Sequence, residues 1–206
     1  SKDINLTSAG DVALVRDTRD KIFSPTSGSR NSLSVEYAGG PLGGDAEYTK
    51  LEGSTSWYFP LFWSTVFHVR GSAGKAFENE NNKLPVYEHF YLGGMNSIRG
   101  FDSASISPVD PLTGDKIGGD KMWFANIEYI FPLIKDMGMD GLIFHDLGNV
   151  YDVDEDWDFG EYKKTAGVGI LWASPLGPLR LAWGYNLDQK DGENQSSWDF
   201  SMGGTF

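Results

Sequence analysis

The chain has no cysteine, few basic residues and no long apolar run. Without cysteine there is no thiol nucleophile, no cysteine-ligated metal and no disulfide. A net charge of −12 argues against nucleic-acid binding, because contacts to phosphates need a basic face. The longest stretch without charge, residues 53–69, is interrupted by Pro60 and several polar side chains. It cannot be a membrane-spanning helix, which needs about 20 apolar residues.

Glycine and aromatic residues are abundant instead. The 206 residues include 26 glycines and 14% aromatics, a combination that favours strands and turns. This length suits a single domain, residues 1–206. The first residues lack the apolar core of a signal peptide, so we expect no targeting segment in them.

Apolar residues alternate with polar or small ones in segment after segment, with the period of two that a strand with two different faces requires. The clearest case is residues 179–188. Its apolar face consists of Leu179, Leu181, Trp183, Tyr185 and Leu187. Helical periodicity is hard to find, so the sequence predicts an all-β, antiparallel fold.

The positions of the aromatic residues distinguish a membrane barrel from a soluble sandwich or barrel. They gather near the ends of the expected strands, as the aromatic girdles of an outer-membrane barrel do. These positions are residues 57–59, Trp63, Phe131, Trp172, Trp198 and Phe206. We therefore expect a transmembrane β-barrel, with a soluble β-sandwich or barrel as the alternative.

Nine strands are expected, and their connections alternate between short and long. The expected ranges are 9–19, 30–38, 47–59, 62–75, 120–131, 140–151, 163–173, 179–188 and 196–206. Short turns of such barrels face the periplasm and long loops face outward, which places the last strand's end in the periplasm. Because complete bacterial barrels have even strand counts, nine strands predict a slice of a larger barrel. If the first segment is not a strand, the alternative is a complete eight-stranded barrel.

The connection 76–119 is too long to lack a role by default. It contains Arg99 between glycines and an aromatic residue, and this arginine could fold back into the barrel lumen. There its guanidinium group would need carboxylates. Glu128 and Asp146, in following strands, are the candidate partners, and Gly148 would leave room beside Asp146. A solvated loop arginine and water-facing carboxylates are the alternative.

Four motifs resemble the C-terminal half of the barrel in the BamA family of outer-membrane assembly factors, also called the bacterial surface antigen family. They are IRGF at 98–101, the segment 123–132 with Glu128, FHDLG at 144–148, and WASPLGP at 172–178. The resemblance covers essentially the whole chain. It implies that Ile98, Arg99, Gly100 and Phe101 form the tip of a long loop that packs inside the lumen against acidic strand residues. It also implies a sixteen-stranded barrel, whose first strands and periplasmic POTRA domains are missing from the match.

The same resemblance implies a function in the outer membrane of a Gram-negative bacterium. The expected activity is non-enzymatic insertion of unfolded outer-membrane proteins, with the lipid bilayer, lipopolysaccharide and periplasmic accessory lipoproteins as partners. Open strand edges could also attract another copy of the chain. A translocation pore of the two-partner secretion type, which shares the arginine motif, is the alternative.

The last strand resembles the signal by which outer-membrane barrels are recognised for assembly. Its apolar positions are Trp198, Phe200, Met202 and Phe206. An aromatic residue at the membrane interface would give the same pattern, and both interpretations can hold together.

Enzymatic function and cofactor binding are not expected. The possible histidine bases are His68, His89 and His145, and none lies in a recognisable Ser-His-acid context in the sequence. A small lipid hydrolase is therefore the weakest alternative. The acidic run 152–158 could bind divalent cations, but a solvated loop is the simpler interpretation, so no metal or cofactor is predicted.

Overall fold

The computed structural model describes residues 4–80, 83–175, 177–190 and 192–203, and its main feature is one sheet of nine strands. The strands are β1 Ala9–Asp17, β2 Gly28–Ala38, β3 Tyr48–Pro60, β4 Val66–Glu78, β5 Lys121–Ile134, β6 Met139–Tyr151, β7 Lys163–Ser174, β8 Gly177–Asn186 and β9 Ser196–Met202. Four 3-10 turns accompany them, at Gly40–Leu42, Phe62–Ser64, Val86–Glu88 and Lys135–Met137. No helix within these ranges has the length and hydropathy needed to cross a bilayer.

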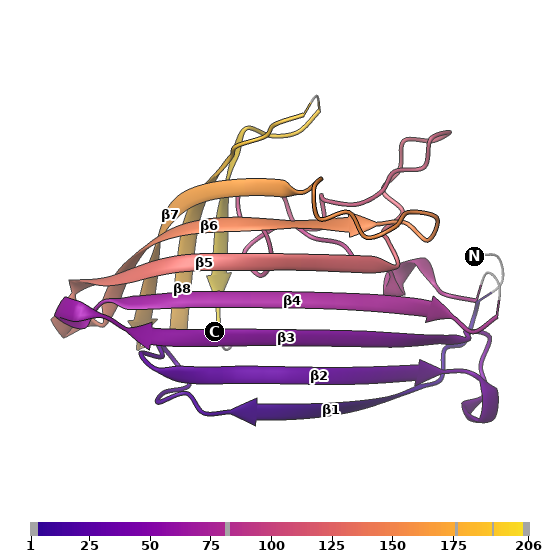
Figure 1. Cartoon of the computed structure of the whole chain (residues 1–206), viewed down its shortest axis with the longest axis horizontal. Coiled ribbons are helices and arrows are strands. Elements are labelled where there is room, and N and C mark those ends of the chain that lie inside the picture. The colour runs from indigo at the N-terminus through magenta and orange to yellow at the C-terminus, as the bar shows by residue number, and fades with distance from the viewer. Residues whose placement is uncertain (1–3, 81–82, 176, 191, 204–206) are drawn as a thin grey trace.

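The strands pair antiparallel in chain order, each with the next. β1 to β6 run side by side, and the sheet then curls so that β8 and β9 turn steeply away from them (Figure 1). In the described part of the chain β1 and β9 are the two edges of this open, curved sheet. All nine expected strands are confirmed, and β1 pairs with β2 from Ala9 to Asp17, so the first segment is a strand.

The largest boundary error at the start of a strand lies in β4, expected at residue 62 and observed at Val66. β9, expected to reach residue 206, ends at Met202, and residues 204–206 lie outside the described range. Residues Phe62–Ser64 form a 3-10 turn in which Trp63 has a φ of 57°, and this conformation cannot continue an extended strand. The side chain of Trp63 is 83% exposed. The turn carries the apolar residues Leu61, Phe62 and Trp63 in a row, so hydrophobicity alone does not mark its end.

The two faces of the sheet differ as the alternation predicts. On the convex side Leu181, Tyr185 and Phe200 are exposed, while Ala182 and Asn186 on the concave side are buried. Residues 57–59 do not all belong to the outer aromatic belt. Tyr58 is buried on the concave side, where its ring stacks on His68 at 4.1 Å between centroids. Adjacent residues of a strand face opposite sides, so three consecutive aromatics cannot share one face.

The connection between β4 and β5 spans residues 79–120 and folds back against the concave face of the sheet. Isolated bridges between Phe90 and Gly119 and between Leu92 and Ile106 give it internal structure. Its apolar residues share one buried cluster with residues of the strands. This cluster contains Ala38, Ala46, Tyr48, Ala76, Leu84, Phe90, Leu92, Ile98, Phe101, Ile106, Met122, Phe124 and Val150. The inner loop, residues 79–120, is thus the second layer of the fold. Its apolar side chains pack against the concave face of the sheet and form the buried core with it.

Candidate functional site

Arg99 of the inner loop is buried against the concave face of the sheet, with 5% of its surface exposed. Its Nε donates to Oδ2 of Asp146 at 2.8 Å and its Nη2 to Oδ1 at 2.7 Å, a bidentate pair. The backbone N–H of Arg99 donates to the same carboxylate at 3.0 Å. Asp146 lies in β6 and is fully buried. One carboxylate therefore holds both the side chain and the backbone of the loop tip.

Glu128 of β5 completes the pairing of the guanidinium group. Nη1 of Arg99 lies 2.6 Å from Oε1 of Glu128, and the Phe144 ring lies under Cζ of Arg99 at 3.7 Å from its centroid. Two carboxylates and an aromatic face thus surround a single cation. Such a buried charge is tolerated because its hydrogen-bond donors are satisfied.

The ion-pair cluster extends through neutral side chains of the neighbouring strands. Asn126 donates to Asp146 Oδ1 at 2.8 Å and to the carbonyl oxygen of Ser97 in the loop at 2.6 Å. On the other side, Nδ1 of His68 lies 2.7 Å from Glu128 Oε2. Because a carboxylate can only accept, this nitrogen carries the proton. The loop tip is therefore bound to β5 and β6 by a continuous network.

The structure also brings together a serine, a histidine and an acid. Nε2 of His68 lies 2.9 Å from Oγ of Ser56, so Ser56, His68 and Glu128 form a hydrogen-bonded chain. The sequence did not predict this arrangement of a serine, a histidine and an acid, because the three residues lie in three different strands. The acid is also bound by Arg99, so its charge is shared between the histidine and the guanidinium group.

The other two histidines are hydrogen-bonded to backbone carbonyl groups. Nδ1 of His89 lies 2.9 Å from the carbonyl oxygen of Ile117, and Nδ1 of His145 lies 2.7 Å from that of Thr165. Within the described residues no group of three or more metal-ligating side chains is assembled, the acidic run 152–158 included.

Gly100 follows the arginine and lies against β8 and β9. Its φ is +90°, a conformation that favours glycine, and its N–H donates to Oδ2 of Asp199 at 3.1 Å. Gly184 of β8 lies so close that a Cβ on it would be 2.5 Å from the nitrogen of Gly100. Ile98 and Phe101 on either side are buried in the apolar cluster. All four residues of the loop motif thus have a defined place inside the curved sheet.

Gly148 contacts the loop only indirectly. A Cβ at this position would lie 2.4 Å from the carbonyl oxygen of Trp123 and 2.7 Å from Phe124, both in β5. Its missing side chain therefore gives room to Phe124, which in turn packs in the cluster that contains Ile98 and Phe101.

The last strand presents its apolar residues outward. Trp198, Phe200 and Met202 are exposed by 68%, 65% and 67%, on the face that meets lipid in a barrel. Phe206, expected to end the same stripe, lies outside the described residues.

Several residues of the site were not predicted from the sequence, namely Ser56, His68, Asn126, Phe144, Gly184 and Asp199. A signal existed for some of them, because Asn126 and Phe144 stand two positions from Glu128 and Asp146 and therefore share their face of the sheet. The partners across strands could not be found without the register, which pairs Asn126 with Asp146.

The sequence of the chain has clear relatives. A family model described as the Omp85 superfamily domain matches residues 1–206. The outer membrane protein assembly factor BamA of Nitratidesulfovibrio vulgaris is 42% identical over 206 residues, covering 98% of this chain and 26% of that protein. BamA of Neisseria meningitidis is 29% identical over 96% of this chain and 28% of its own length. The chain thus spans about a quarter of these relatives.

Solved structures agree on the fold. BamA from Haemophilus ducreyi lacking POTRA domains 1–3 matches with a TM-score of 0.79 at 23% identity, over 95% of this chain and 42% of that chain. CdiB from Acinetobacter baumannii matches less well, with a TM-score of 0.61 at 17% identity, over 93% of this chain and 32% of that one. The nine-stranded sheet has the fold of the BamA barrel, and with the family model matching its full length the chain belongs to the Omp85 superfamily.

Proposed function

We propose that this chain is the C-terminal part of an outer-membrane assembly factor, which inserts unfolded outer-membrane proteins into the outer membrane of a Gram-negative bacterium. The observation that carries the proposal is the 42% identity to a BamA over 98% of the chain. The docked loop supports it, because Arg99 pairs with Asp146 and Glu128 inside the curved sheet as the resemblance to this family implies.

The chemistry of the proposed insertion is non-covalent. In the described residues β9 pairs with β8 alone, and we propose that the other edge of β9 is the seam at which an incoming strand pairs. Such β-augmentation matches backbone hydrogen bonds and needs no catalytic group. The exposed Trp198, Phe200 and Met202 place the same strand against lipid, where the new strand must arrive. Lipopolysaccharide and periplasmic accessory lipoproteins are proposed as further partners.

The test is a chimera in which these 206 residues replace the matching segment of the Nitratidesulfovibrio vulgaris protein. Reconstituted in liposomes, the chimera should speed the folding of an unfolded outer-membrane protein, read as its shift on unheated gels. A chimera that is itself folded but no faster than empty liposomes would refute the proposal. A translocation pore of the two-partner secretion type stays the alternative, and would instead give large single-channel conductance in planar bilayers.

A further inference from the structure

The last strand, β9, presents a row of polar side chains to the inner loop. The row consists of Ser197, Asp199 and Ser201, which alternate with the exposed Trp198 and Phe200 of the other face. β9 is the shortest of the nine strands, and its seven residues all pair with β8. In the described sheet it has a partner strand on one side only, so contacts from the loop add to what holds it in place.

Asp199, in the middle of the row, accepts a hydrogen bond from the loop tip. The N–H of Gly100 donates to its Oδ2 at 3.1 Å, and a Cβ on Gly94 would lie 3.7 Å from its Oδ1. The residue before Gly100 is Arg99, whose side chain binds β5 and β6. Two consecutive residues of the loop thus bind two distant parts of the curved sheet.

Asp102 of the loop makes a second link, in the opposite direction. Oγ of Ser197 donates to its Oδ1 at 3.4 Å, and Nδ2 of Asn194, in the turn before β9, donates to its Oδ2 at 2.8 Å. The loop therefore donates to a carboxylate of the strand, and the strand and its turn donate to a carboxylate of the loop. Such reciprocal bonds fix the position of β9 along the loop as well as its distance from it.

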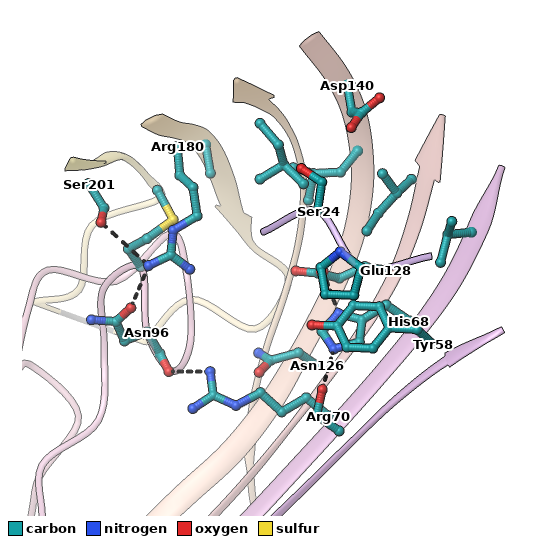
Figure 2. Close-up of a pocket in the computed structure, with 18 of the residues that line it drawn as sticks. Ser24, Tyr58, His68, Arg70, Asn96, Asn126, Glu128, Asp140, Arg180 and Ser201 are labelled. Atoms are coloured by element: carbon teal, nitrogen blue, oxygen red, sulfur yellow. Dashed lines mark hydrogen bonds and ion pairs between the residues drawn. The ribbon is translucent and has the colours of Figure 1, made fainter. Parts of the chain in front are cut away.

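Ser201, the third residue of the row, is linked to the loop through Arg180 of β8. Nη2 of Arg180 donates to Oγ of Ser201 at 3.4 Å and to Oδ1 of Asn96 at 2.8 Å. Figure 2 shows the guanidinium group of Arg180 bonded to both side chains. All three residues of the concave row of β9 are therefore linked to the loop segment 96–102.

The same segment also reaches the other side of the curved sheet. Nη1 of Arg70, in β4, donates to the carbonyl oxygen of Asn96 at 3.1 Å. Each strand pairs only with its neighbours in the chain, so the ladders connect β4 to β9 through four intervening strands. Segment 96–102 connects them directly, across the concave side.

We propose that segment 96–102 of the inner loop fixes the position of β9, with Asp102 and Asp199 as the positioning residues. Short strands paired on one side open easily, and the loop opposes this opening. The consequence for assembly rests on the proposed function, in which an incoming strand pairs at the free edge of β9. Docking of the loop then determines where this edge lies and how firmly it is held.

Hydrogen–deuterium exchange of the 206-residue chain in detergent micelles tests the coupling strand by strand. Asp199→Ala and Asp102→Ala each remove bonds to β9 or its turn and keep the ion pairs of Arg99. The amides of β9 should exchange about tenfold faster in Asp199→Ala and about threefold faster in Asp102→Ala, whose bonds are more exposed. The amides of β5 should exchange as in the parent chain.

Asp140→Ala is the matched control, because Asp140 lies on the concave side of β6, which pairs with β5 and β7. It should leave the exchange of β9 unchanged. Asp199→Asn keeps an oxygen that can accept from Gly100, and its β9 should exchange within a few-fold of the parent. Exchange of β9 at the parent rate in both Asp102→Ala and Asp199→Ala would overturn the proposal. Equal acceleration in β5 and β9 would overturn it too, because it would show a general loss of stability.

The consequence for assembly is measured separately, in the chimera described above. With Asp199→Ala, the chimera should fold its outer-membrane substrate several-fold more slowly than the parent chimera does. An unchanged rate, despite faster exchange of β9, would overturn the link between the position of this edge and insertion. An inactive parent chimera would refute the proposed function alone, since the exchange of β9 is measured without insertion.

Discussion

Gly100 in the inner loop and Gly184 in β8 pack backbone against backbone. A Cβ on Gly184 would lie 2.5 Å from the nitrogen and 2.6 Å from the Cα of Gly100. Since backbone cannot move aside as a flexible side chain can, Gly184→Ala should displace the loop tip. We expect a loss of about 1–3 kcal/mol, the usual cost of overpacking, measured by thermal unfolding in detergent.

Gly53→Ala is the matched control for that substitution. Its Cβ would meet Leu33 at 3.9 Å, an ordinary contact, and its φ is not positive. An equal loss of stability in the two variants would show that the effect belongs to strand glycines in general and not to loop docking.

Removing the charge of Arg99 should destabilise the chain strongly. Arg99→Met leaves Asp146 and Glu128 buried without their partner, and breaking a buried pair in this way typically costs about 3–5 kcal/mol. Ser97→Ala, two residues away, removes local bonds to Gly93 and should cost less. Equal shifts of the unfolding temperature for the two variants would contradict the docking of the arginine.

The hydrogen bonds that link Ser56, His68 and Glu128 should stabilise the fold and should not support hydrolysis. His68→Ala removes a partner of Glu128 and the stacking partner of Tyr58, so we expect a lower unfolding temperature. Hydrolysis of lipid esters by the parent chain should equal the blank and stay there in the variant. Ester cleavage that is lost in both His68→Ala and Ser56→Ala would instead establish an enzyme.

Lys121, the first residue of β5, binds the outer loop 152–162. Its Nζ donates to the carbonyl oxygens of Asp152 and Glu155 at 2.8 Å each, and lies 2.9 Å from Asp120 Oδ1. Lys121→Met should free these acceptors and make the loop more susceptible to proteolysis. Lys164→Met, in β7, is the control. Unchanged cleavage of the loop in Lys121→Met would show that the lysine does not hold it.

The sequence predicted the order and number of strands because alternating segments such as residues 179–188 recur along the chain and turns or loops separate them. It predicted the ion pairs of Arg99 because an arginine buried in a lumen needs carboxylates, and few lie on the inner face of the following strands. It did not predict that Tyr58 turns inward or that Gly148 makes room for Phe124, because both depend on the register between strands. The hydrogen bonds that link Ser56, His68 and Glu128 were not predicted for the same reason.

The central claim is that Arg99 docks the inner loop through Asp146, and a double-mutant cycle tests it most directly. Arg99→Met and Asp146→Asn are compared singly and together by unfolding in detergent. The account predicts a coupling energy at the upper end of the usual range for contacting residues, about 2–3 kcal/mol, so that the double variant loses less stability than the sum of the two single losses by this amount. Additive losses, with no coupling, would contradict the docked loop.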